Sequence, residues 1–164
     1  MPRTLRDQYK PYLIKFMRFR DGVAYEKNHE FSEQELGTIT PVQIVRWMSL
    51  KVYGTPDPEY DANPTEGRST SLVYCKKALS FFMPNNGWPW NALSNPPAGN
   101  PTKSGPVNDL IKRVRKKEVR KQGKPSQARG AFEEEEFEQL LEIMERFVDV
   151  EKRLFVSAIF RLQY

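Results

Sequence analysis

The sequence predicts an all-α fold, in which a bundle of short helices is followed by a basic segment and a further helical region. Apolar residues recur at the three- and four-residue spacing of amphipathic helices in several segments of the 164-residue chain. Prolines and glycines separate these segments. No segment has the convincing alternation of a half-buried strand, and the sequence has no internal repeat.

The first helix is expected near the amino terminus and is predicted to end at Asp21-Gly22. Its apolar side is formed by Tyr9, Leu13, Phe16 and Met17. The polar stretch over residues 26–38 indicates a connection or a short ragged turn. Thr40-Pro41 then supplies a cap and a first-turn proline for a second helix, which Gly54 ends. Its apolar side is formed by Ile44, Val45, Met48 and Val52.

Residues 55–68 are predicted to form an irregular loop, because their three prolines withhold amide donors. Ser69 or Thr70 can cap the third helix, and Pro84 stops it. Its apolar side is formed by Leu72, Cys75, Leu79 and Phe82. A second proline-rich loop follows over residues 88–103. Trp88, Trp90 and Leu93 are too apolar for a freely solvated loop, so we expect this part to pack on the helices.

The fourth helix is expected to start near residues 104–106. It would bury Val107, Leu110, Ile111 and Val114. An acidic helix is predicted over residues 132–147, because glutamates crowd its first turn, where the helix dipole favours them. The organisation we expect is an amino-terminal helix and connection (1–40), a helical domain (41–118), a basic linker (119–130) and the start of a second domain (131–164). Because the last amphipathic stretch has no stop signal, we expect the second domain to be truncated.

Charge is distributed unevenly along a chain whose formal net charge is only +5. Residues 107–129 contain nine lysines and arginines, opposed only by Asp109 and Glu118. Such a density of cations is difficult to pack against protein, but it matches the phosphates of a nucleic acid, whose neutralisation releases condensed counterions. The alternative is a solvated charged face followed by a flexible linker. Because the cations continue past the helix almost unopposed, the sequence favours nucleic-acid contact; the run is also compatible with a nuclear-import signal.

The third helix is a second candidate for phosphate binding. Ser69 and Thr70 lie at its amino end beside Arg68, and Lys76 and Lys77 follow in its middle. Free amides and the dipole at a helix amino terminus bind phosphate. An ordinary helix start with surface lysines explains this pattern equally well. The tryptophans of the second loop could stack on bases, but core packing is the favoured interpretation.

Several classes of function lack support in the sequence. The chain has one cysteine and one histidine, so it offers neither an internal disulfide nor a multi-cysteine metal site. No nucleophile, histidine and acid combination and no phosphate-cradling glycine loop is present. We therefore expect no catalytic residues, no cofactor and no small-molecule substrate. Without a long apolar run or a signal core, an intracellular protein that does not enter a membrane is expected.

The segments together resemble the amino-terminal, core-binding part of tyrosine recombinases of the phage-integrase type, especially the Crypton-like recombinases of eukaryotes. The resemblance lies in RSTSLVYCKKALSFFMPNNGWPWN and in NPTKSGPVNDLIKRVRKKEVRKQGKPSQARGAFEEEEFEQLL. In this family a catalytic-domain helix is introduced by a pattern such as R-x-L-T-x-E-E-x-x-x-L-L. The comparable residues here are Arg129, Phe132, Glu134, Glu135, Phe137, Leu140 and Leu141, whereas Gly130 and Ala131 depart from the commoner wording.

The resemblance implies a short orthogonal, SAM-like helical bundle that lies on one face of duplex DNA, with the linker crossing to the other face. It implies a role in DNA recombination and integration, with a nuclear location more expected than a cytoplasmic one in a eukaryote. The family's catalytic residues have no confident match: Arg161 lacks the acidic pair expected after the first arginine, and Tyr164 comes too early to be the nucleophile. The chain should therefore bind double-stranded DNA without cutting it, and homo-oligomers on DNA are left open.

A helical protein-interaction module, whose basic segment serves solubility or import, is the alternative from another class. For the DNA-binding function, the expected contact residues are Arg68, Ser69, Thr70, Lys76, Lys77, Lys103, Lys112, Arg113, Arg115, Lys116, Lys117, Arg120, Lys121, Lys124 and Arg129.

Overall fold

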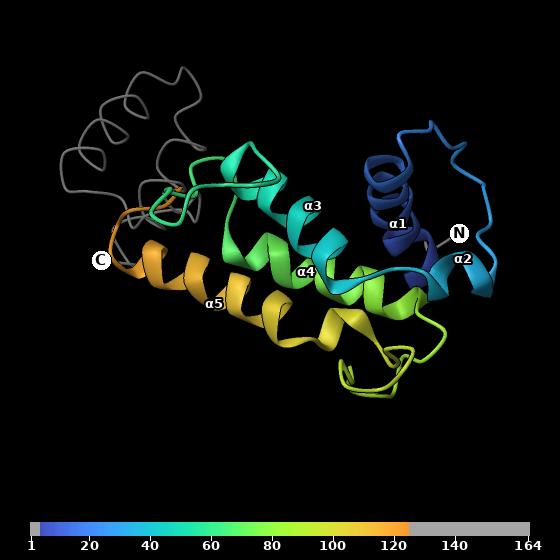
Figure 1. The fold of residues 1–164 in the computed structure, drawn as a ribbon. Coiled ribbons are helices and arrows are strands. Elements are labelled where there is room, and N and C mark those ends of the chain that lie inside the picture. The colour runs from blue at the N-terminus through green and yellow to red at the C-terminus, as the bar shows by residue number, and fades with distance from the viewer. Residues whose placement is uncertain (1–3, 125–164) are drawn as a thin grey trace, which may run out of the picture. The chain divides into compact units, whose positions relative to one another are not determined.

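The computed structural model describes residues 4–124, and these residues form five α-helices and one short 3-10 helix (Figure 1). No strand occurs among them, only an isolated antiparallel bridge between Asn91 and Ala98. The predicted all-α class is confirmed. Contacts within the chain divide it into Met1–Pro125 and Ser126–Tyr164. The predicted acidic helix, the final amphipathic stretch and Arg129 lie outside the described residues.

Helices α1 (Leu5–Asp21) and α3 (Pro41–Tyr53) end where the sequence predicts. The side chain of Thr40 accepts a hydrogen bond from the Gln43 amide at the start of α3, and Pro41 occupies the first turn. Gly22 and Gly54 follow the two helices with positive φ angles of 69° and 74°. Glycine adopts this conformation without steric cost, so both stops follow from local chemistry.

One helix was not predicted. Helix α2 (Glu33–Gly37) lies within the stretch that we interpreted as a connection or a ragged turn. A reciprocal capping box starts it, in which Ser32 accepts from the Glu35 amide and the Glu35 carboxylate accepts from the Ser32 amide. Leu36 of α2 and the following Ile39 are buried against the bundle. Five residues are too few to show helical periodicity, which explains the omission.

Helix α4 (Ser69–Phe82) begins with Arg68 as its capping residue, and no side chain of its own first turn caps it. The expectation that Ser69 or Thr70 would serve as the cap is therefore wrong. A 3-10 helix, η1 (Pro101–Lys103), precedes α5 (Gly105–Val119), whose start agrees with the prediction. After α5, Lys121 has a φ of 57°, and the amides of Lys121 and Gln122 bond back to the carbonyls of Glu118 and Lys117.

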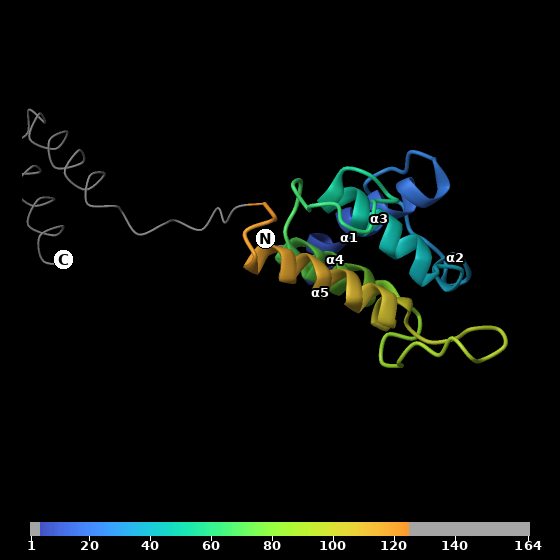
Figure 2. The ribbon, with the colours of Figure 1, turned by 60° about the vertical axis from the view of Figure 1, so that its left-hand side comes forward.

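The core lies between four helices. Helix α4 packs against α1 on one side and α5 on the other, and α3 contacts both α1 and α5 (Figures 1 and 2). Helices α4 and α5 run antiparallel. The largest side chains with almost no exposure include Phe16, Met17, Ile44, Met48, Leu72, Leu79 and Leu110. All of these were expected on apolar faces, whereas Tyr9 and Phe82 are only half-buried.

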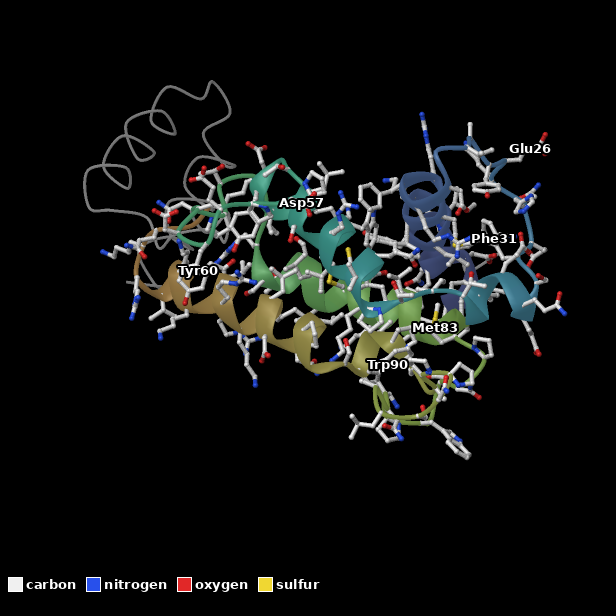
Figure 3. The ribbon with its side chains drawn as sticks, in the orientation of Figure 1. Glu26, Phe31, Asp57, Tyr60, Met83 and Trp90 are labelled. Carbon is white, nitrogen blue, oxygen red and sulfur yellow. The ribbon has the colours of Figure 1, made fainter. Side chains whose placement is uncertain are left out.

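The loop between α4 and η1 departs from the sequence-based expectation. Trp88 is 72% exposed and Leu93 is 96% exposed, so neither side chain packs on the helices. Only Trp90 is half-buried, and it lines a depression with Met83 and Leu36 (Figure 3). Some backbone amides and carbonyls of the loop bond to one another. Asn91 and Ala98 exchange two backbone hydrogen bonds, of 2.8 and 3.1 Å. The loop therefore keeps its form without burying its apolar side chains.

Gly99 is required for this loop. Its φ is 99°, and an added Cβ would lie 2.0 Å from the Pro89 carbonyl oxygen. We predict that Gly99→Ala lowers the free energy of unfolding by about 2 kcal/mol or more, because the backbone must move. Chemical denaturation measures this change. The matched control is Gly87→Ala, where a Cβ meets nothing within 4 Å. Equal stability of the two variants would contradict the prediction.

Candidate nucleic-acid interface

The outer face of α5 is densely cationic. Val107, Leu110, Ile111 and Val114 form its buried stripe. At about 100° per residue, the lysines and arginines between positions 112 and 120 spread over an arc of about 200° on the remaining surface. The exposed ones are Lys112, Arg115, Lys116 and Arg120, with Lys121 directly after them. Helix geometry thus directs these exposed cations, though not Arg113 and Lys117, toward solvent.

Most of these exposed cations have no internal partner. The Lys112 ammonium nitrogen lies 3.8 Å from a carboxylate oxygen of Asp109. Both side chains are more than 70% exposed, so solvent screens the pair. Within residues 4–124, no hydrogen bond or salt bridge engages the side chains of Arg115, Lys116 or Arg120. The same is true of Arg113, which is half-buried, and of Lys121. These groups remain available to an external anion.

Lys117 on α5 and Lys124 after it were also predicted to contact DNA, but both have partners within the fold. The Lys117 ammonium donates to the carbonyl oxygens of Asp61 and Ala62 at 2.5 and 2.6 Å, and to the Asn63 side chain at 3.1 Å. An ammonium has only three protons, so these bonds use all of them. The Lys124 ammonium donates to the Glu66 carbonyl at 3.0 Å, and the Lys124 amide donates to Pro64. Lys117 fastens the loop over residues 55–67 to α5, and Lys124 fastens it to the segment that follows this helix.

Glu118 turns away from the cationic face. Its carboxylate accepts hydrogen bonds from the Ser69 amide at 2.7 Å and the Ser69 hydroxyl at 2.6 Å. The Arg68 guanidinium lies 3.6 Å away. The amino terminus of α4, where we expected a phosphate, thus holds a carboxylate of the same chain. Ser69 is buried beneath it, Arg68 is half-buried, and Thr70 alone of the three is exposed.

A second group of cations lies where α4 passes the start of α5. The Lys76 ammonium donates to the Asn108 side chain at 2.5 Å, and the Lys103 ammonium donates to the Gly87 carbonyl at 3.0 Å. Lys76, Lys103 and the exposed Lys77 line a depression of about 390 Å³. Tyr9 and Phe81 also line it. Burial, and then the charge of Lys103, lower the pKa of Lys76. A bound anion would offset both effects.

A wider groove runs along the other side of α5. It has a volume of about 740 Å³ and lies between this helix and residues 60–63. Its cationic side is lined by Arg113, Lys116, Lys117 and Arg120. Asp61 and Asp109 place negative charge in the same groove. Tyr60, which is 89% exposed, stands at its edge (Figure 3). Tyr60 was not among the predicted contact residues, because it lies in a loop without periodicity.

Other chemistry has little support in the described part of the chain. Cys75 is buried, as expected, and burial raises the pKa of its thiol, so it is a poor nucleophile. No three metal-binding side chains converge anywhere in residues 4–124. Among the described helices, none combines the length and apolar character that crossing a bilayer requires.

Comparisons with known proteins yielded no relative. No protein-family model, no curated protein and no solved structure matches this chain.

The Glu118 contact has a measurable consequence. Ser69 bonds to both carboxylate oxygens of Glu118, and glutamine replaces one of these acceptors by an NH2 group. We predict that Glu118→Gln lowers the free energy of unfolding by about 1–3 kcal/mol, because one bond is lost and the charge of Arg68 is no longer balanced. Thermal and denaturant unfolding measure the loss. Asp109→Asn, which removes the same charge from an exposed position of the same helix, should cost about 0.5 kcal/mol or less. A comparable loss in both variants would show that the buried contact is unimportant.

Proposed function

We propose that this chain binds duplex DNA through the outer face of α5 and the neighbouring lysines of α4 and η1. The observation that carries the proposal is the set of exposed cations on α5 that lack partners in the described chain. Their contact is with phosphates, so it positions the protein without reading base sequence. The favoured anchors are Lys77, Lys112, Arg115, Lys116, Arg120 and Lys121.

Electrostatics favour this partner. Cations of the same sign on one short helix repel one another, and a polyanion relieves the repulsion while releasing its own condensed counterions. At 1.5 Å per residue, the 15 residues of α5 extend over about 22 Å. A DNA strand carries one charge per about 3.4 Å of axis, so a helix of this length can pass about six phosphates. The inward orientation of Glu118 removes an acidic group that would otherwise oppose them.

The wider proposal is that the chain corresponds to the core-binding part of a tyrosine recombinase. Its support is the order of features: a helical bundle comes first, and basic residues are concentrated at its carboxyl end. In that arrangement the bundle holds one face of the duplex, and the residues after α5 lead to the catalytic domain. The chain itself would bind DNA and leave strand transfer to residues that it lacks. Nuclear import through the same basic residues is compatible with this role.

We predict that replacing Lys112, Arg115 and Lys116 by glutamine weakens binding to every duplex sequence alike. The loss of three phosphate contacts should reduce the slope of log K against log salt by about 2–3 units. Fluorescence anisotropy on a labelled duplex across a salt series measures both effects. Lys117 is left unchanged, because its loss would release the loop over residues 55–67 and confuse the result.

The matched control replaces Lys15, Arg18 and Lys27 by glutamine, which changes the net charge equally at exposed positions on α1 and the segment after it. Since α1 lies on the other side of α4 from α5, this variant should keep the wild-type salt slope (Figure 1). Equal slopes for both triple variants would remove α5 from the interface. If the whole chain ignores duplex DNA in dilute buffer, the recombinase proposal fails. A protein partner retained in heparin would then favour an interaction module.

A further inference from the structure

The loop between α4 and η1 combines two unusual properties. Residues 78–102 contain no charged side chain, although lysines stand at both ends, at positions 77 and 103. Within this neutral stretch, Leu93 is 96% exposed and Trp88 is 72% exposed. Large apolar side chains with this exposure have a cost in water, which contact with a partner removes.

Hydrogen bonds hold the loop in a defined form. The buried Asn100 amide donates to the Ser80 hydroxyl at 2.8 Å and to the Asn86 carbonyl at 3.3 Å. The Asn100 backbone amide donates to the Trp88 carbonyl. Near the tip, the Leu93 amide donates to the Asn91 side chain at 3.0 Å. Trp90 anchors the base of the loop beside Met83 (Figure 3). A loop held in this way loses little further entropy when it binds.

The base of the loop joins the second group of cations. Lys103 holds the Gly87 carbonyl, and Asn86 lines the same depression as Lys76 and Lys77. A phosphate bound in that depression would therefore lie beside the loop. In Figure 2 the loop extends away from the helices next to the start of α5.

The size and charge of the loop favour DNA over protein as its partner. An aromatic side chain buries about 150–250 Å², so Trp88 and Leu93 together supply far less than the roughly 800 Å² that each partner contributes to a stable protein complex. The exposed Leu93 near the tip of the loop suits insertion into a DNA groove, where leucine and other apolar side chains enter between base steps and kink the duplex. Because the loop lacks acidic residues, nothing in it repels the flanking phosphates.

We propose that the loop over residues 88–99 is a wedge that enters a groove of duplex DNA and bends it, next to a phosphate held by Lys76, Lys77 and Lys103. This inference rests on the proposed function and adds a second mode of contact to it. The α5 cations supply affinity that depends on salt. The wedge supplies affinity that does not, together with a change in the shape of the DNA.

The test compares wild-type chain with Leu93→Gln and Trp88→Gln on a duplex of about 25 base pairs that carries a fluorophore at each end. Energy transfer reports the bend, and anisotropy across a salt series reports affinity. We expect wild-type protein to shorten the distance between the ends. Each variant should bind about tenfold more weakly, with reduced bending and an unchanged salt slope, because the phosphate contacts remain.

The matched control is Val23→Gln, which replaces a 52% exposed valine in the segment that follows α1. It should bind and bend DNA as wild-type does. All three substitutions lie at exposed positions, and equal thermal unfolding midpoints would show that the fold is retained.

The outcomes separate the wedge from the proposed function. The wedge proposal fails if wild-type protein binds DNA with the expected salt slope but does not bend it. It also fails if both variants bend DNA as wild-type does. In either case the proposed α5 interface still stands. Loss of self-association in the variants, with DNA bending unchanged, overturns it in favour of a second copy as the partner. Absence of any duplex binding by the wild-type chain overturns the proposed function, and the wedge with it.

Discussion

The bond between Glu118 and Ser69 is the contact on which the rest of the arrangement depends. It joins the carboxyl end of α5 to the amino end of α4 across 49 positions of sequence. The carboxylate satisfies a free amide where the helix dipole is positive, and it does so in a largely buried place. One side chain therefore ties together two ends of the antiparallel helices that the core already packs, and it leaves the outer face of α5 with few acidic groups.

The cations around α5 divide into two groups with different physical roles. Lys117 and Lys124 hold the carbonyl groups of a proline-rich loop that has few backbone bonds of its own. Arg115, Lys116 and Arg120 contribute nothing comparable to the described fold. A protein gains little stability from exposed charges of one sign, so the described fold gives no reason for their concentration on one face. Phosphate contact provides such a reason, and the groove beside α5 gives it room.

Local chemistry made much of the fold predictable. Glycines and Thr40-Pro41 marked helix ends, and apolar spacing identified the buried faces of α1, α3, α4 and α5. The failures have physical causes. Helix α2 is too short for periodicity, although Ser32 and Glu35 carried its capping signal. The composition of the loop between α4 and η1 could not show whether its side chains pack on the helices. The hydrogen bonds of Asn91 and Asn100 hold the backbone of this loop without such packing.

The sequence predicted which cations belong to the candidate site. It did not predict which of them lack partners within the fold. That Lys112 and Lys116 face solvent follows from helical spacing. That Lys117 is saturated depends on carbonyls 54 to 56 positions away, which no local pattern reveals. The same holds for Ser69, whose bonding partner is equally remote. Contacts between residues far apart in the sequence determine which charged side chains are bonded within the fold.

The left-handed conformation of Lys121 links the strain of the backbone to the charge at the carboxyl end of α5. The bonds that the Lys121 and Gln122 amides donate back to α5 form a closing motif in which glycine is the usual residue at position 121. A side chain there is strained by about 1 kcal/mol. Replacement by glycine would relieve the strain, yet it would also delete a positive charge at the exit from α5. Lysine at this turn therefore costs conformational strain and keeps a positive charge beside the carboxyl end of α5.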